Sequence, residues 1–167
     1  MALSPLCHNV LANPSFETGS LSPWWPTAVD VAQISNGSTA YSGDFYLDLQ
    51  TAVGNRGNAI SQRLTGLHVG ANYTFSVQIQ TRSPSAANYC GFFAYTGRNA
   101  TTNAIASELL YEPGEWVQLT GSYVPKRPED VLHVGGSCTF SGSSYTGHVL
   151  LDDIFLGRGE DCSVVLD

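Results

Sequence analysis

The feature that most constrains this chain is a series of short segments in which apolar and polar residues alternate. The clearest is the segment from Asn72 to Arg82, where Tyr73, Phe75, Val77 and Ile79 share one face and mainly hydroxyl and amide side chains share the other. Alternation with a period of two is typical of a β-strand with one buried face. Patterns with a helical period are nearly absent, so the sequence predicts an all-β fold.

Other segments are predicted as strands and are separated by the Gly, Pro, Asn and Ser residues that favour turns, although the alternation is less clean in 116–124. They lie at 44–49, 116–124, 131–140 and 149–156. The last segment is apolar on both faces apart from Asp152 and Asp153, which is typical of a central strand covered on both sides. With 167 residues and no evident linker or repeat, we predict a single antiparallel β-sandwich domain over residues 1–167.

Composition and charge exclude several classes of protein. Hydrophobic residues make up 43% of the chain and charged residues only 13%, which is the opposite of a disordered acidic chain. The net charge of -7, with only seven Lys and Arg residues, argues against binding to nucleic acid. No apolar run approaches the roughly 20 residues of a membrane helix, so we expect a soluble protein with no membrane partner. We also expect a monomer.

The cysteines and the glycosylation sequons indicate a secreted, extracellular protein. Four cysteines are present and none forms a C-x-x-C pair, which argues against a zinc site. Three Asn-x-Ser/Thr sequons predict glycosylation at Asn36, Asn72 and Asn99. No signal-peptide pattern follows Met1, so we interpret the sequence as a mature chain with an added start codon. A cytosolic protein with four reduced thiols is the alternative.

The alternation also suggests how the cysteines pair. Cys90 is in phase with Phe92 and Ala94, and Cys138 is in phase with another apolar face, so both thiols are expected inside the sandwich. Cys7 and Cys162 flank the first and last predicted strands, and the two termini of a domain often lie close together. We predict the pairs Cys90–Cys138 and Cys7–Cys162, although four cysteines permit three pairings.

Two segments carry a resemblance to a known group of domains. The segment from Asn9 to Gly19, which reads NVLANPSFETG and is followed by Trp24, resembles the opening strand of carbohydrate-binding modules of families four, nine and twenty-two. The segment from Leu150 to Leu156, LLDDIFL, is similar to the closing strand of the same group. Shorter motifs lie between them in the expected order, including Gly114-Glu115-Trp116. The resemblance covers residues 9–157, and the cysteine content is similar to that of small secreted fungal members.

The resemblance implies a galactose-binding-like jelly roll of two antiparallel sheets, one of them concave, with Trp24 and Trp116 buried in the core. It also implies a structural calcium ion near the first and last strands. The expected calcium ligands are Glu17, Asp44, Asp152 and Asp153, together with backbone oxygens from 41–44. Calcium binds six to eight oxygen atoms, so this set is chemically sufficient. The alternative is that Glu17 and Asp152 accept hydrogen bonds from buried backbone N–H groups.

A sugar-binding face combines flat aromatic rings with amide and charged side chains. The face opposite the predicted core offers such residues. The expected ligand-binding residues are Tyr46, Asp48, Gln78, Gln80, Arg82, Tyr89, Phe93 and Tyr95, with Trp25 as a contact at the rim. The aromatic residues among them could instead pack under a long loop or a glycan.

Catalysis is not supported by any arrangement in the sequence. Asp44 and Asp48 would lie roughly 13 Å apart along a strand, whereas the two carboxylates of a glycosidase lie about 5–9.5 Å apart. The four histidines are scattered, and a lone histidine is more often a surface residue or a hydrogen-bonded buried residue than a catalytic base. We therefore expect a non-catalytic, secreted carbohydrate-binding module that recognises a polysaccharide or glycan. The alternative is an effector-like jelly roll that binds another protein.

Overall fold

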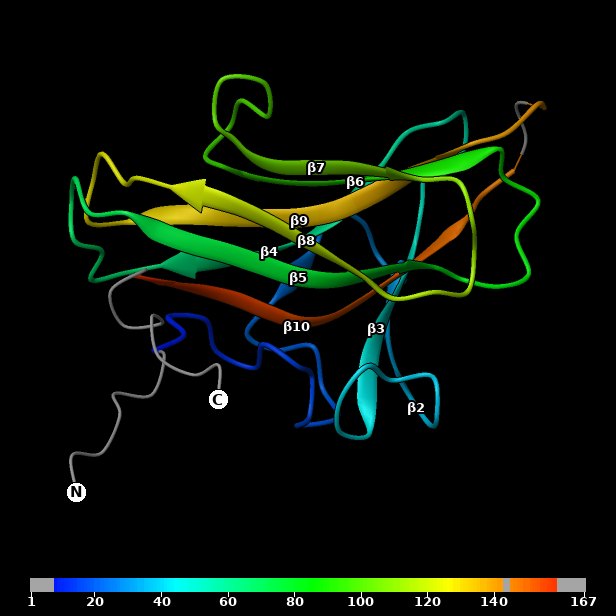
Figure 1. Cartoon of the computed structure of the whole chain (residues 1–167), viewed down its shortest axis with the longest axis horizontal. Helices are drawn as coiled ribbons and strands as arrows, with labels where there is room; N and C mark the ends of the chain where they lie inside the picture. Colours follow the sequence, from blue (N-terminus) through cyan, green and yellow to red (C-terminus); the bar gives the residue numbers. More distant parts are fainter. Residues whose placement is uncertain (1–7, 143–144, 159–167) are drawn as a thin grey trace.

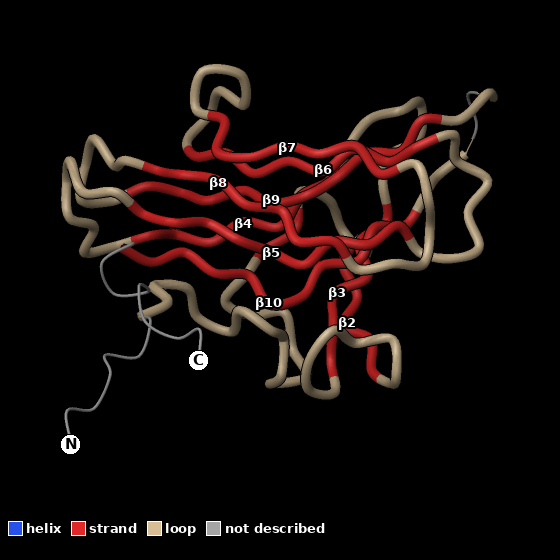
Figure 2. Tube along the Cα trace, viewed as in Figure 1, coloured by secondary structure: helices blue, strands red, loops and turns tan. Residues whose placement is uncertain are grey.

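A computed structural model describes residues 8–142 and 145–158. Within these ranges the chain forms β-strands and loops without a helix, as Figures 1 and 2 show. No helix long and apolar enough to cross a membrane is therefore found in the described ranges. The strands are β1 (Trp25–Pro26), β2 (Ala32–Asn36), β3 (Phe45–Gln50), β4 (Asn58–Leu64), β5 (Tyr73–Thr81), β6 (Tyr89–Thr96), β7 (Ala104–Leu110), β8 (Val117–Tyr123), β9 (Asp130–Thr139) and β10 (His148–Arg158).

The strands form two five-stranded antiparallel sheets. The first sheet has the order β1-β4-β9-β6-β7, and the second sheet has the order β2-β3-β10-β5-β8. Most strands follow the long axis of the molecule in Figure 1, whereas β2 and β3 turn out of that direction. The predicted all-β sandwich is confirmed.

The hydrophobic core lies between the two sheets. Along β5, Tyr73, Phe75, Val77 and Ile79 are at most 2% exposed, so the alternation in the sequence marks the core face correctly. β10 lies in the middle of the second sheet between β3 and β5, as its apolar character predicted. At about 25 cal/mol per Å² of apolar surface, burial of such side chains supplies most of the stabilising free energy.

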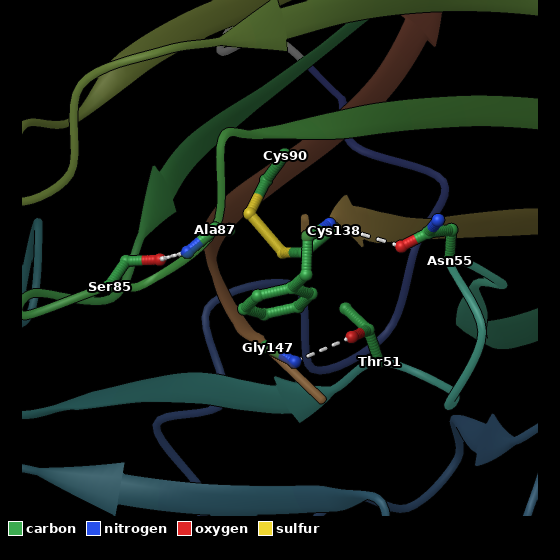
Figure 3. Close-up of a disulfide and its surroundings, with 8 residues drawn as sticks. Thr51, Asn55, Ser85, Ala87, Cys90, Cys138 and Gly147 are labelled. Atoms are coloured by element: carbon green, nitrogen blue, oxygen red, sulfur yellow. Dashed lines mark hydrogen bonds between the residues drawn. A yellow bond between two sulfur atoms is a disulfide. The ribbon is translucent and has the colours of Figure 1, made fainter. Parts of the chain in front are cut away.

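The disulfide Cys90–Cys138 joins β6 to β9 inside the core, and this prediction is confirmed (Figure 3). The two residues are directly opposite each other in the strand register, and each is at most 1% exposed. Gly147, the residue just before β10, packs directly on this bridge, because a Cβ atom added there would lie 2.5 Å from the Cys138 sulfur. The predicted partners Cys7 and Cys162 lie outside the described residues.

The segment before β1 is irregular, although the sequence favoured an opening strand here. It runs beside β10, with the Val10 N–H bound to the Leu156 carbonyl at 2.9 Å. The Asn9 amide also donates to the Ile154 carbonyl at 2.8 Å. Phe16 is fully buried and Trp24 is 4% exposed, so the prediction that Trp24 is a core residue is confirmed.

Candidate functional site

The outer face of the second sheet carries the polar residues expected there. Leu47 and Leu49 of β3 are fully buried in the core, so Tyr46 and Asp48 point the opposite way. Leu150 of β10 is directly opposite Asp48 on one side and Gln80 of β5 on the other. Tyr46, Asp48, Gln78, Gln80 and Arg82 therefore belong to one face, as predicted.

A cleft of about 590 Å³ opens on this face. Its lining includes three aromatic residues, Tyr41, Tyr46 and Trp116, and two polar residues, Gln80 and Arg82. Tyr41 is 49% exposed, whereas Gln80 is only 5% exposed. The cleft thus combines accessible ring surface with a buried amide and a charged group, which is the composition of a small-ligand site.

The three aromatic rings form one group along the cleft. The ring centre of Trp116 lies 6.1 Å from that of Tyr41 and 6.5 Å from that of Tyr46, and both contacts are edge-to-face. The Trp116 indole N–H donates to the Thr39 carbonyl at 2.8 Å, which links the loop before β8 to the loop between β2 and β3. The prediction that Trp116 is a core residue is therefore wrong, because its indole is half-buried in the cleft wall.

The position of Trp116 depends on a backbone turn at Gly114. This glycine has φ +92°, a conformation that residues with a Cβ atom rarely adopt. Its N–H donates to the Thr81 carbonyl at 2.9 Å, at the end of β5. A Cβ atom at this position would lie 3.3 Å from Cβ of Ser83, which also lines the cleft. The close approach of this loop to β5 brings Trp116 beside Gln80 and Arg82.

Arg82 is held by a chain of polar contacts on the sheet surface. Its Nη1 donates to Asp48 Oδ2 at 2.9 Å, and the other oxygen of Asp48 lies 2.7 Å from His148 Nδ1. Asp48 is 9% exposed and is not part of the cleft lining. We infer that Asp48 positions the guanidinium, which is the group that faces the cleft.

The loop that carries Tyr41 is held by Asp152. This aspartate has no exposed surface, and its Oδ2 accepts the N–H groups of Tyr41 at 3.0 Å and Ser42 at 3.2 Å. Burial raises the pKa of Asp152 to about 7, because the ionised carboxylate is removed from water, although the N–H bonds act in the opposite direction. Asp152 thus ties the central strand β10 to the wall of the cleft.

Glu17 holds the same loop at its other end. Its carboxylate accepts the N–H groups of Asp44 and Phe45 at 3.1 Å, and Gly43 lies so close that a Cβ atom there would be 2.3 Å from a carboxylate oxygen. The contact of Asp44 with Glu17 is thus made by its backbone. Asp153 Oδ1 accepts the hydroxyl of Ser15 at 2.8 Å.

Two of the carboxylates expected to bind calcium already accept hydrogen bonds from the backbone. Carboxylate oxygens are the donors that calcium prefers, but those of Glu17 and Asp152 already accept backbone N–H bonds. Within the described ranges no group of three or more acidic, His or Cys side chains is arranged to hold a metal. Calcium binding at Glu17, Asp44, Asp152 and Asp153 stays a prediction.

The structure does not bring the other predicted ligand residues to this cleft. Tyr89, Phe93 and Tyr95 belong to β6, and Trp25 belongs to β1, and both strands lie in the first sheet. The three β6 side chains do point outward, but on the opposite side of the sandwich from Gln78 and Arg82. Gln78 lies on the expected face opposite Asp152 and does not line the cleft. The predicted continuous platform of these residues is wrong.

Two residues of the cleft were not predicted as ligand contacts. From the sequence, Tyr41 is expected to contribute only a backbone oxygen, and Trp116 is expected in the core. The signal that could have identified Trp116 is its position just before β8 begins, two residues after the turn residue Gly114. The sequons were predicted from pattern alone, and their residues Asn36, Asn72 and Asn99 are exposed. Glycosylation stays a prediction.

Comparison with known proteins bears on the identity of the domain. Residues 8–132 match the family CBM_4_9, described as a carbohydrate binding domain. No match is found among curated proteins.

Solved structures share the fold at low sequence identity. The CBM22-1 xylan-binding domain of Paenibacillus barcinonensis Xyn10C has a TM-score of 0.67 and 20% identity, over 93% of this chain and 97% of that domain. The C-terminal family 22 module of Clostridium thermocellum Xyn10B has a TM-score of 0.65 and 17% identity, over 99% of this chain and all (100%) of that one. TmCBM61, solved with β-1,4-galactotriose, has a TM-score of 0.63 and 18% identity, with coverage of 90% and 99%.

The match to the family model extends over most of the chain, and the fold and the aromatic cleft agree with it. The chain belongs to the CBM_4_9 family and is a non-catalytic carbohydrate-binding domain.

Proposed function

We propose that the domain binds a linear β-1,4-linked polysaccharide, with xylan as the first candidate, in the cleft of the second sheet. The observation that carries this proposal is the group of Tyr41, Tyr46 and Trp116 beside Gln80 and Arg82. Solved structures with the same fold are described as xylan-binding or as bound to β-1,4-galactotriose, which supports the same class of ligand.

The residues of the cleft suit the chemistry of a sugar ring. One face of a pyranose presents C–H groups, which pack against an aromatic ring, and its edge presents hydroxyl groups. Gln80 offers both a donor and an acceptor for such hydroxyls, and the Arg82 guanidinium offers several N–H donors. Because Arg82 is held by Asp48 and Trp116 by Thr39, the site is ordered before the ligand arrives, which lowers the entropic cost of binding.

The test is titration calorimetry with xylohexaose and with β-1,4-galactotriose, using the wild-type chain and two tryptophan variants. Trp116→Ala should weaken binding by about 1–2 kcal/mol, or roughly five- to thirtyfold, because it removes an aromatic face from the cleft. Trp25→Ala is the matched control, since Trp25 is 44% exposed but lies in the first sheet. Equal losses in both variants would contradict the assignment of the cleft.

If neither oligosaccharide binds a correctly folded wild-type chain, the proposed ligand class is wrong. Binding to another protein would then be the remaining alternative.

We further propose that the domain acts outside the cell and binds calcium at the loop 41–45. The buried disulfide Cys90–Cys138 supports an oxidising compartment. Glu17 and Asp152 would supply carboxylate oxygens to the calcium ion, whose role would be to hold the loop that carries Tyr41.

A further inference from the structure

We propose a second binding site, on the outer face of the first sheet, that takes a uronic acid unit of an acidic glycan. The site is a cavity of about 930 Å³ that shares no lining residue with the cleft of the second sheet. The residues that carry the proposal are Trp25, Arg63, Arg98, Arg127 and His133. This cavity is larger than the cleft proposed for neutral polysaccharide, whose volume is about 590 Å³.

The cavity is formed where loops and strands of the first sheet meet. Trp25 comes from β1 and Arg63 from β4, while Arg98 comes from the loop between β6 and β7. Arg127 lies in the turn between β8 and β9, and His133 lies on β9. Trp25 is opposite Ser61 in the register of β1 and β4, and Ser61 is opposite His133 of β9, so the indole and the imidazole belong to one row across the sheet.

Positive charge is concentrated around this cavity. The chain has a net charge of -7 and only seven Lys and Arg residues, yet three of them line the cavity. An adjoining cavity of about 430 Å³ shares Arg127 and adds Lys126. Four of the seven cationic side chains thus gather at one end of the first sheet. On an acidic protein, such a cluster creates a local positive field that an anionic ligand would encounter.

Two acidic residues, Glu129 and Asp130, also line the cavity and offset part of this field, so three cationic side chains stand against two carboxylates. Glu129 is paired only with Arg63, at 3.9 Å and with both side chains well exposed, so the pair is weak. Asp130 is held by its own contacts, because Oδ2 accepts the Tyr123 hydroxyl at 2.6 Å and Oδ1 accepts the Val131 N–H at 2.8 Å. Within the described part of the chain, neither Arg98 nor Arg127 forms an ion pair.

His133 orders the loop that carries Arg98. A carbonyl oxygen can only accept, so the His133 Nε2–H donates to the Gly97 carbonyl at 2.8 Å, and Nδ1 accepts from the Ser61 hydroxyl at 2.6 Å. The imidazole also stacks on Tyr95 at 4.6 Å between ring centres. A second contact, from the Gly97 N–H to the Val131 carbonyl at 3.0 Å, holds the same loop. The residue next to Arg98 is therefore fixed to the sheet.

The combination of groups favours a carboxylated sugar. A guanidinium binds a carboxylate through two parallel N–H bonds, so Arg98 and Arg127 supply the recognition of the acid group. The indole of Trp25 is 44% exposed and offers a flat surface for the C–H face of the sugar. Asn103 at the cavity wall adds an amide for hydroxyl groups. A neutral sugar would gain nothing from the arginines, so the ring and the amide alone are not expected to hold it here.

The experiment measures the binding of tetragalacturonate, of neutral xylotetraose and of inorganic phosphate to the full chain by titration calorimetry. Arg127→Ala should weaken the binding of tetragalacturonate about tenfold or more, because it removes a charge-assisted contact. Arg56→Ala is the matched control, since Arg56 is an exposed arginine outside the cavity whose Nε donates to the Val53 carbonyl. That variant should bind tetragalacturonate within about twofold of wild type.

The two sites are distinguished by their variants. Trp25→Ala should weaken tetragalacturonate binding and leave xylohexaose binding unchanged, whereas Trp116→Ala should have the reverse effect. Absence of tetragalacturonate binding to the wild-type chain overturns the second site without bearing on the cleft. An equal loss in Arg56→Ala overturns it too, because the attraction would then come from general charge. Phosphate binding as tight as tetragalacturonate binding overturns the assignment to a sugar.

Discussion

Asp152 differs from most acidic residues of the chain in that it is fully buried and holds the loop that forms one wall of the cleft. It is the acceptor for the backbone of Tyr41 and Ser42, and the rings of Tyr41 and Trp116 meet above the same surface. The resemblance implies Asp152 as a calcium ligand, whereas its contacts in the structure give it the role of positioning the aromatic wall. This role does not depend on whether a cation binds beside it.

The first prediction concerns the pH dependence of stability. The pKa of Asp152 is raised to about 7 in the folded state, against 3.8 for the free group, so the folded state binds the additional proton between these values. The free energy of unfolding should therefore fall as pH rises from about 4 to 7. Above the folded pKa the carboxylate is fully ionised, and the stability that the bound proton contributed is lost. Asp152→Asn should lose this component of the pH slope.

The measurement is urea unfolding of both proteins at pH 5 and pH 8 in the presence of a chelator. The free energy of unfolding of the wild type minus that of Asp152→Asn should be larger at pH 5 than at pH 8. A difference that is the same at both values would show that Asp152 is ionised in the folded protein at pH 5.

The second prediction concerns calcium at the same loop. A ligand that binds only the folded state at a hundredfold excess over Kd adds about 2.7 kcal/mol, which should raise Tm by several degrees in a domain of this size. Glu17→Gln should remove most of this response. If a chelator leaves the wild-type melting curve unchanged and calcium does not raise it, the carboxylates serve only the backbone N–H groups.

At the scale of elements, loops decide which side chains meet in the cleft. β3, β5 and β10 supply its floor, but Tyr41 and Trp116 come from the loops before β3 and β8. The turn at Gly114 is the feature that places the second of these loops against the end of β5.

The third prediction tests this turn. Gly114→Ala should destabilise the fold by about 1–2 kcal/mol, because an L-residue is forced into positive φ. It should also weaken xylohexaose binding, because the added Cβ atom pushes against Ser83 and moves Trp116. Gly54→Ala is the control, since Gly54 has φ +80° and no atom within 4 Å of an added Cβ. Equal xylohexaose affinities for the two variants would show that the turn does not set the cleft.

Comparison of the strands and loops with the sequence patterns shows how far the sequence could predict the structure. Alternation identified β5 and β9 and their core faces, because a face that is buried on one side only imposes a period of two, whereas β10 was identified by its continuous apolar run. Alternation could not assign β6 to a sheet, since the outward face of a strand looks the same in either layer of a sandwich. Tyr95 was therefore placed with Arg82 although the two lie on opposite sides. Trp116 was missed because its position depends on a turn and not on a periodic strand.

At the scale of the whole molecule, the sandwich presents two chemically different outer faces. The second sheet has the aromatic cleft with Gln80 and Arg82, and the first sheet has the cationic cavity around Trp25. The disulfide Cys90–Cys138 lies in the core between the sheets and joins the neighbouring strands β6 and β9 of the first sheet.

The fourth prediction concerns that disulfide. The bridge closes a loop with a sequence separation of 48 residues. For such a loop the chain-entropy model gives about 4 kcal/mol of stabilisation. Replacing both cysteines by alanine should lower the free energy of unfolding by roughly 2–4 kcal/mol, as measured by urea unfolding. An unchanged midpoint of unfolding would contradict a structural role for the bridge.

The central claim is that a neutral polysaccharide binds in the cleft beside Trp116. It can be tested by NMR, because the chain has three tryptophans in three environments: Trp24 in the core, Trp25 at the cationic cavity and Trp116 in the cleft. Titration with xylohexaose should shift the indole N–H signal of Trp116 in a saturable manner and leave those of Trp24 and Trp25 in place. A saturable shift of Trp25 with Trp116 unchanged would contradict the claim.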